Sequence, residues 1–89
     1  FFPDVLDNNL IDQYIKTDDE ESFKMSRKLI KEEGLLCGGS CGSAMVAALK
    51  AAKSLTRNQK VLVVLPDSIR NYMTKFPNDS WMIENGFEI

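Results

Sequence analysis

The sequence predicts an α/β fold: a βαβαβ-type parallel sheet with flanking helices. Three observations carry this prediction. Residues 61–65 form a continuous β-branched run, which is typical of a central parallel strand covered on both faces. Residues 44–55 are apolar and rich in alanine, which is typical of a helix buried on most sides. Segments of strand and helix character alternate along the chain, and that order favours a parallel sheet with right-handed crossovers.

The opening residues predict a turn-rich lead-in followed by a strand. The chain begins Phe1-Phe2-Pro3, with no initiator Met, and turn formers continue through residue 9. We interpret this beginning as that of a piece cut from a longer protein. Residues 10–16 carry two apolar pairs and are predicted to form the first strand.

A strong helix start follows this strand. Thr17 is the expected N-cap, and Glu20, three residues on, completes a capping box. The helix is expected to run to about Glu33, with Gly34 as its stop. Its inward stripe is expected to consist of Phe23, Met25, Ser26, Leu29 and Ile30.

The second half of the chain completes the alternation. Residues 35–37 fit a buried strand end, and a helix is predicted from about Ser40 to Leu55. The strand at 61–65 ends at Pro66, after which a short helix should run to about residue 75. A last helix is expected within residues 77–85, capped by Asn78 or Asp79 and ended by Gly86.

Composition excludes several classes of function. The 89 residues carry a net charge of −2 with Lys and Arg spread along the chain, so neither nucleic acid nor an anionic membrane is an expected partner. No apolar run reaches the roughly 20 residues of a membrane span. Cys37 and Cys41 are the two cysteines and histidine is absent, so no metal site is expected. Their spacing favours reduced, packed thiols and a cytoplasmic setting.

The glycine turn between residues 37 and 43 is the strongest candidate site. Its glycines allow close approach of a ligand, and Ser40 or Ser43 could cap the next helix or contact that ligand. Asp67 and Ser68 follow the predicted central strand, so they should lie at the same sheet edge as Ser40. Asp67 could equally cap the short helix that follows.

Three interpretations of this turn remain open on pattern alone. The residues Gly38-Gly39-Ser40-Cys41-Gly42 match the G-x-S-x-G turn of α/β-hydrolases, but that chemistry needs a histidine that this sequence lacks. A purely structural strand-to-helix turn and a small-molecule site are the other two. The turn is neither a Walker A loop nor a G-x-G-x-x-G motif.

At these residues the sequence resembles the fold-type II pyridoxal-phosphate enzymes. The likeness rests on residues 33–40, on Gly42-Ser43 with the alanine-rich helix, and on residues 66–76 and 79–82. The latter blocks, with residues 5–7 and 16–23, are similar to the branch that condenses serine with homocysteine to cystathionine, releasing water. Residues 1–89 would then be the C-terminal part of its catalytic domain. Cys41 is a departure, since the family usually has alanine or serine there.

The resemblance implies roles for specific residues. Ser40 would hydrogen-bond the pyridine nitrogen of pyridoxal phosphate, with Gly38 and Gly39 also at the cofactor and Asp67 acting indirectly. Ser43 is expected to bond backbone amides instead. No lysine here matches the one that forms the Schiff base, so no catalytic residue is expected within this chain. Haem would be possible only through a segment that this chain does not hold.

The resemblance also implies amino-acid substrates, with hydrogen sulfide release when cysteine is used, and a homodimer or higher homo-oligomer. Two alternatives remain. One is a cysteine synthase of the same fold, which uses an activated serine and sulfide. The other is a non-catalytic α/β piece whose glycine turn binds an anion or a partner.

Overall fold

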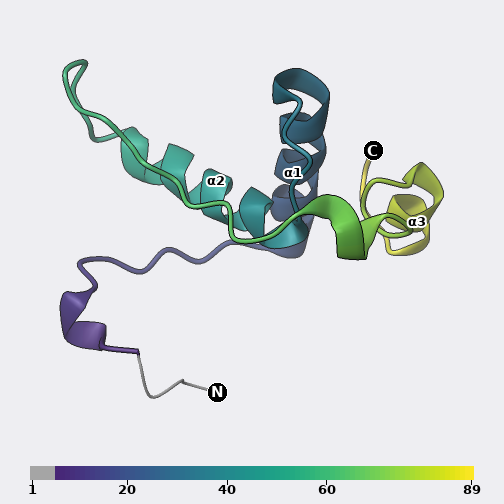
Figure 1. Cartoon of the computed structure of the whole chain (residues 1–89), viewed down its shortest axis with the longest axis horizontal. Coiled ribbons are helices and arrows are strands. Elements are labelled where there is room, and N and C mark those ends of the chain that lie inside the picture. Colours follow the sequence, from purple (N-terminus) through teal and green to yellow (C-terminus); the bar gives the residue numbers. More distant parts are fainter. Residues whose placement is uncertain (1–5) are drawn as a thin grey trace.

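Two packed helices, α1 (Asp19–Glu33) and α2 (Gly39–Ala52), form the centre of the structure (Figure 1). It is a computed structural model, and it describes residues 6–89. The other helical elements of residues 6–89 are the 3₁₀ turns η1 (Asn8–Leu10) and η2 (Ile69–Tyr72) and the short helix α3 (Asp79–Glu84). The Phe1-Phe2-Pro3 opening lies outside the described residues.

The predicted parallel sheet is wrong for these residues. Residues 11–16 and 61–67 form no strand pairing, and the single pairing in the described part of the chain is an antiparallel bridge between Cys37 and Ser68. Leu62 and Val64 are 92% and 74% exposed, where a central strand would be covered. A strand is stable only when a neighbour accepts and donates its backbone hydrogen bonds, and residues 6–89 provide no such neighbour for this run.

The helix α1 ends where its sequence predicts but begins one residue later. Asp18, not Thr17, is the N-cap: its carboxylate accepts the Glu21 N–H at 2.8 Å, and the Glu21 carboxylate accepts the Asp18 N–H at 3.1 Å. This capping box is the same device that was expected from Thr17 and Glu20, displaced by one position. Gly34 ends the helix in the left-handed conformation, with φ of 68°.

The other helices are shorter than predicted. The helix α2 stops at Ala52 instead of Leu55, and the segment expected to be helical to residue 75 is the 3₁₀ turn η2. Helix α3 is capped by Asn78, whose side-chain oxygen accepts the Trp81 N–H at 3.2 Å. Gly86 follows with a positive φ of 80°.

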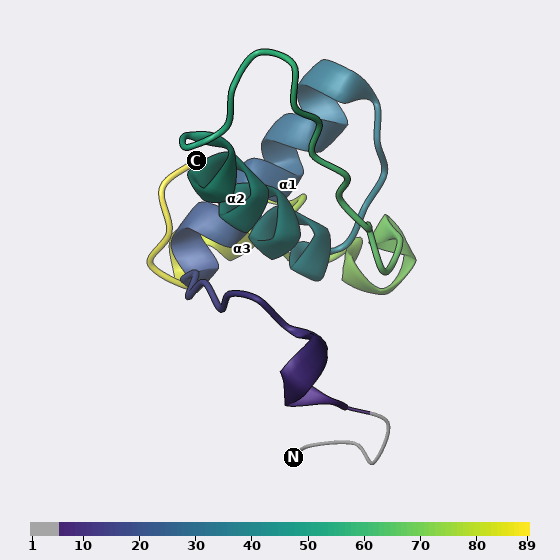
Figure 2. The same ribbon diagram turned by 90° about the vertical axis from the view of Figure 1, so that its left-hand side faces the viewer.

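The helices α1 and α2 cross and contact each other directly (Figure 2). Their contact buries Leu29, Cys37 and Cys41, with Met25 and Met45 packed against them. Buried serines lie on the same side of α1, since Ser22 is 5% exposed and Ser26 is completely buried. The predicted inward stripe of α1 is confirmed at Ser26 and Leu29, with Met25 packed against the core, whereas Ile30 is only half-buried. Ser22 is an additional buried residue.

An aromatic cluster joins the C-terminal segment to α1. The Phe23 ring lies 5.6 Å from Phe76, 5.4 Å from Trp81 and 5.5 Å from Phe87, measured between ring centroids. Phe76 is completely buried. The Arg27 guanidinium donates to the Phe76 carbonyl at 2.7 Å and also pairs with Asp79, which fixes the start of α3. These contacts set the position of residues 68–89 relative to α1.

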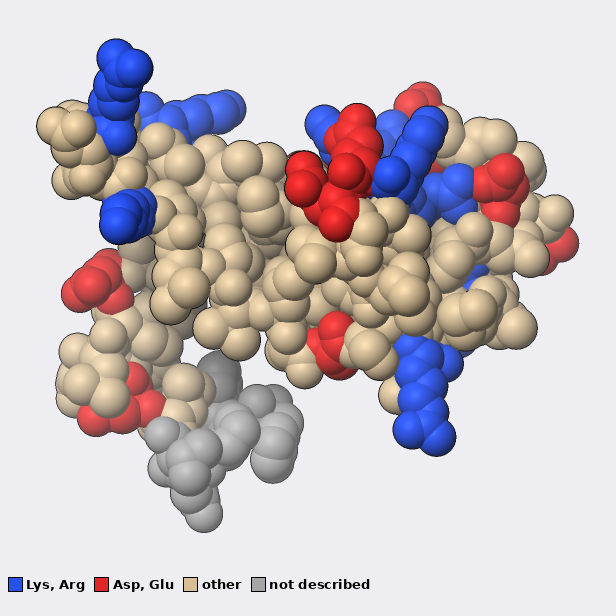
Figure 3. All heavy atoms as spheres, turned by 45° about the horizontal axis from the view of Figure 1, so that its top comes forward, with Lys and Arg blue, Asp and Glu red and all other residues tan. Residues whose placement is uncertain are grey.

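Charge is mixed over the surface. On the face drawn in Figure 3, acidic and basic side chains lie beside one another around α1, and a broad uncharged expanse covers the middle of the molecule. The exposed apolar residues of α2 and the returning segment include Leu49, Leu62 and Val64. Among the helices that the structure describes, none combines the length and the apolar character needed to cross a bilayer.

Candidate functional site

The glycine turn connects the end of α1 to the beginning of α2. Gly38 is the N-cap of α2, with extended backbone at φ −82° and ψ −179°, and no side chain caps the helix there. Residues 37–39 are buried, whereas Ser40, in the first turn of α2, is exposed. Within residues 6–89 no hydrogen bond engages the Ser40 hydroxyl, so this group is available to a ligand.

Helix α1 packs against the glycine turn. The buried Ser26 hydroxyl donates to the Gly38 carbonyl at 3.0 Å. Gly42 lies so close to α1 that an added Cβ would stand 1.9 Å from the Ser22 carbonyl oxygen. The glycine at 42 therefore serves helix packing, not ligand approach.

Ser43 has a different role from the one predicted. Its hydroxyl donates to the Ser22 hydroxyl at 2.8 Å, across the two helices, and does not bond the backbone amides that the sequence suggested. The Ser22 hydroxyl in turn donates to the Asp18 carbonyl at 2.7 Å. Ser43 thus belongs to the contact between α1 and α2.

Asp67 meets the glycine turn from the other side, as the sequence predicted, although no sheet brings it there. The Gly38 N–H donates to the Asp67 carbonyl at 3.2 Å, and the Cys41 thiol approaches the same oxygen at 3.1 Å. Beside this contact, Cys37 and Ser68 form the antiparallel bridge. The segment after α2 therefore returns along the molecule to the beginning of α2 (Figure 1).

The Asp67 carboxylate fills the space beside Gly38. A Cβ at Gly38 would lie 2.2 Å from Asp67 Oδ1, so any larger residue would displace this side chain. The Tyr72 hydroxyl donates to Asp67 Oδ2 at 2.9 Å. This hydrogen bond to a carboxylate raises the pKa of Tyr72.

The two cysteines are packing residues, as their spacing predicted. Both are buried free thiols, 4% exposed at Cys37 and fully buried at Cys41. Burial, with a smaller contribution from Cys41, raises the pKa of Cys37. A thiol held in its neutral form is a poor nucleophile and a poor metal ligand. No group of three His, Cys, Asp or Glu side chains is placed to hold a metal ion within residues 6–89.

The sequence did not predict that Ser22 and Tyr72 would shape the turn. It also did not predict that Ser26, expected on the inward face of α1, would act as a hydrogen-bond donor. The sequence held a signal for the serines, because two small polar residues four apart lie on the same face of a helix. No comparable signal marked Tyr72, since its partner is set by how η2 folds back on the turn.

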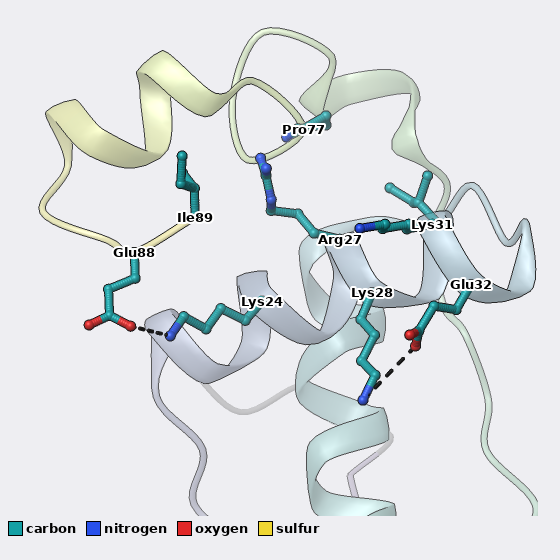
Figure 4. Close-up of a pocket in the computed structure, with 9 residues that line it drawn as sticks. Lys24, Arg27, Lys28, Lys31, Glu32, Pro77, Glu88 and Ile89 are labelled. Carbon is teal, nitrogen blue, oxygen red and sulfur yellow. Dashed lines mark hydrogen bonds and ion pairs between the residues drawn. The ribbon is translucent and has the colours of Figure 1, made fainter.

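A hollow lies away from the glycine turn and is lined by the basic face of α1 (Figure 4). Its volume is about 560 Å³, and its basic side chains are largely paired within the chain. Lys24 contacts Glu88 at 2.8 Å, and Lys28 contacts Glu32 at 3.9 Å. The hydrogen bond with Lys24 lowers the pKa of Glu88. We interpret this hollow as an ion-paired surface.

Comparison with known proteins places the glycine turn in a family context. The family model described as "Pyridoxal-phosphate dependent enzyme" matches residues 2–67. The chain is 67% identical to a cystathionine beta-synthase of Dictyostelium discoideum and 55% identical to that of Mus musculus, each over 98% of this chain. It spans 18% and 16% of the length of those two relatives. It is also 44% identical to a cysteine synthase of Helicobacter pylori, over 84% of this chain and 24% of that protein.

Proposed function

Because the chain belongs to the family of pyridoxal-phosphate dependent enzymes, we propose that it is the C-terminal part of a catalytic domain that condenses serine with homocysteine. The products of the proposed reaction are cystathionine and water. The similarity to cystathionine beta-synthases supports this choice, since it covers 98% of the chain and exceeds the 44% identity to a cysteine synthase. Amino-acid substrates and a homo-oligomeric assembly belong to the same proposal. The buried free thiols favour a reducing, cytoplasmic setting.

The single observation that carries the proposal is the exposed, unpartnered hydroxyl of Ser40 in the first turn of α2. This group fits the pyridine edge of the cofactor, because a hydroxyl can donate one hydrogen bond to a ring nitrogen. The turn does not suit the phosphate end. The Asp67 carboxylate fills the space beside Gly38, and two negative groups so close together would repel each other. The phosphate is therefore expected to be held by residues outside this turn.

The chemistry of the reaction is supplied by the cofactor, which when bound acts as an electron sink for bond cleavage at the amino-acid carbons. Ser40 contributes orientation and electronic tuning. A hydroxyl carries no charge, so Ser40 does not hold a proton on the ring nitrogen as a carboxylate would. This neutral partner disfavours long-lived carbanions and favours elimination and replacement at the β carbon.

The glycine turn contributes rigidity. The Ser26 hydroxyl of α1 donates to the Gly38 carbonyl, and the Gly38 N–H donates to the Asp67 carbonyl. Both backbone polar groups of Gly38, two residues before Ser40, are therefore hydrogen-bonded. Because the backbone before Ser40 is held, it loses little conformational entropy when the cofactor binds. Burial raises the pKa of the Cys37 thiol beside the turn, which makes it a poor nucleophile.

The full-length protein that contains this segment tests the proposal. The purified protein should show the absorption band of bound pyridoxal phosphate and should form cystathionine from serine and homocysteine. A protein that instead forms cysteine from an activated serine and sulfide, and no cystathionine, would show that the cysteine synthase alternative is right. Absence of the cofactor band would favour the non-catalytic binding piece.

A further inference from the structure

Asp67 is attached to the turn that carries Ser40 at two places. Its carbonyl oxygen accepts the Gly38 N–H at 3.2 Å and the Cys41 thiol at 3.1 Å. Gly38 and Cys41 lie on either side of Ser40 and are themselves joined, since the Cys41 N–H donates to the Gly38 carbonyl at 3.2 Å. Ser40 is therefore held in a short backbone loop whose two ends both depend on Asp67.

The side chain of Asp67 has little freedom in this arrangement. Oδ1 lies where a Cβ of Gly38 would be, and it is 3.5 Å from the Cys41 sulfur. Oδ2 accepts the Tyr72 hydroxyl at 2.9 Å. Without that phenol, Oδ2 would lose the hydrogen bond that holds the side chain in this position.

Tyr72 is itself fixed by packing. Its ring lies 5.6 Å from the ring of Phe76, a completely buried member of the aromatic cluster. Its ring edge also approaches Gly39, where an added Cβ would stand 3.9 Å away. The tyrosine thus connects the aromatic cluster to the glycine turn.

We propose that Tyr72 is a positioning residue for the cofactor site: through Asp67 it fixes the turn on which Ser40 presents its hydroxyl. This inference rests on the proposed function, because it names what orients the same hydroxyl. Tyr72 acts on Asp67 and need not touch the cofactor.

The test compares Tyr72→Phe with Tyr14→Phe in the full-length protein. Tyr14, the other tyrosine of this chain, is exposed and its hydroxyl bonds Asn8, far along the chain from the turn. Each change removes one phenolic hydroxyl and keeps the ring. The measurements are the dissociation constant of pyridoxal phosphate, the absorption spectrum of the bound cofactor, and the thermal unfolding midpoint.

Tyr72→Phe should weaken cofactor binding about tenfold and shift the cofactor spectrum, because a hydrogen bond to a charged group is lost. Tyr14→Phe should change neither. Asp67→Asn completes a double-mutant cycle: in that background Tyr72→Phe should cost less than about threefold. A merely structural role would lower the unfolding midpoint without moving the spectrum.

Three results would overturn the inference. One is a Tyr72→Phe protein with the cofactor affinity and spectrum of the Tyr14→Phe control. Another is an effect of Tyr72→Phe that is undiminished in the Asp67→Asn background. The third is a wild-type protein that binds no cofactor, which would also overturn the proposed function. A wild-type protein that binds cofactor but forms no cystathionine would overturn only the proposed reaction, and the comparison of cofactor affinities would still decide the role of Tyr72.

Discussion

Replacing Gly42 with alanine should force the two central helices apart. The added Cβ would lie 1.9 Å from the Ser22 carbonyl oxygen and 2.3 Å from the Ser26 hydroxyl oxygen. The carbonyl is part of the backbone of α1, so it cannot rotate out of the way as a flexible side chain could. The helices must therefore shift, and the interhelical bond between Ser43 and Ser22 must lengthen.

Two opposing effects set the size of the change. Overpacking of a tight contact costs about 1–3 kcal/mol, and a clash with backbone belongs at the upper end. Alanine is a better helix former than glycine by about 1 kcal/mol, which offsets part of that cost. We expect Gly42→Ala to destabilise the protein by about 2 kcal/mol, seen as a lower unfolding midpoint.

The assay is thermal unfolding of the full-length protein, with a control for helix propensity in the same helix. Lys50 is exposed and pairs with Glu21, and both Lys50→Ala and Lys50→Gly remove that pair. The difference between these two variants therefore measures the preference of α2 for alanine over glycine. If Gly42→Ala raises the midpoint by the amount this control gives, the close contact between the helices at Gly42 is refuted.

Three further predictions concern the site, the thiols and the isolated chain. In the full-length protein Ser40→Ala should weaken cofactor binding and slow turnover more than Ser43→Ala, by about 1–3 kcal/mol, and Ser40→Asp should be worse still; cofactor affinity and turnover of the three variants check this, and a more damaging Ser43→Ala would contradict it. Burial raises the pKa of Cys37, so the contribution of this thiol to stability is complete below the pKa of the unfolded thiol and is lost as pH rises through the folded value. Urea titrations of the wild-type protein at alkaline pH should therefore show a loss of stability that Cys37→Ala lacks. Equal losses in the two proteins would refute the assignment. The 89-residue chain made alone should be inactive and should associate, because no lysine in it matches the family's Schiff-base lysine and because Leu62 and Val64 expose apolar surface; cystathionine formation, or a sharp cooperative melt of a monomer, would contradict this.

The sequence by itself determined the features that depend on neighbours a few residues apart. Helix α1 has the predicted last residue and glycine stop, and α3 is capped by Asn78, one of its two predicted caps, because caps and stops are local hydrogen bonds and backbone angles. The inward stripe of α1 followed from helical periodicity alone. The one-residue displacement of the first cap reflects two acceptable candidates, Thr17 and Asp18, side by side in the chain.

The candidate site was predictable in part. The glycine turn and the approach of Asp67 were expected from the sequence, and the structure brings them together. The predicted proximity of Asp67 to the glycine turn is correct, but the predicted sheet is not. An antiparallel bridge and a returning loop bring the two segments together in place of a parallel sheet edge. The role of Ser40 toward the cofactor stays a prediction.

Only the tertiary structure decided which elements pair. Residues 61–65 have the composition of a central strand, but pairing is a property of two segments, and no second strand lies beside them within residues 6–89. The hydrogen bond between Ser43 and Ser22 joins residues that are 21 positions apart in the chain, and the one between Tyr72 and Asp67 joins residues five positions apart. Each depends on how a helix or turn packs on its neighbour. Local preference sets the helices, whereas the geometry between helices sets the site, because each of these hydrogen bonds forms only after packing has brought its two partners within reach.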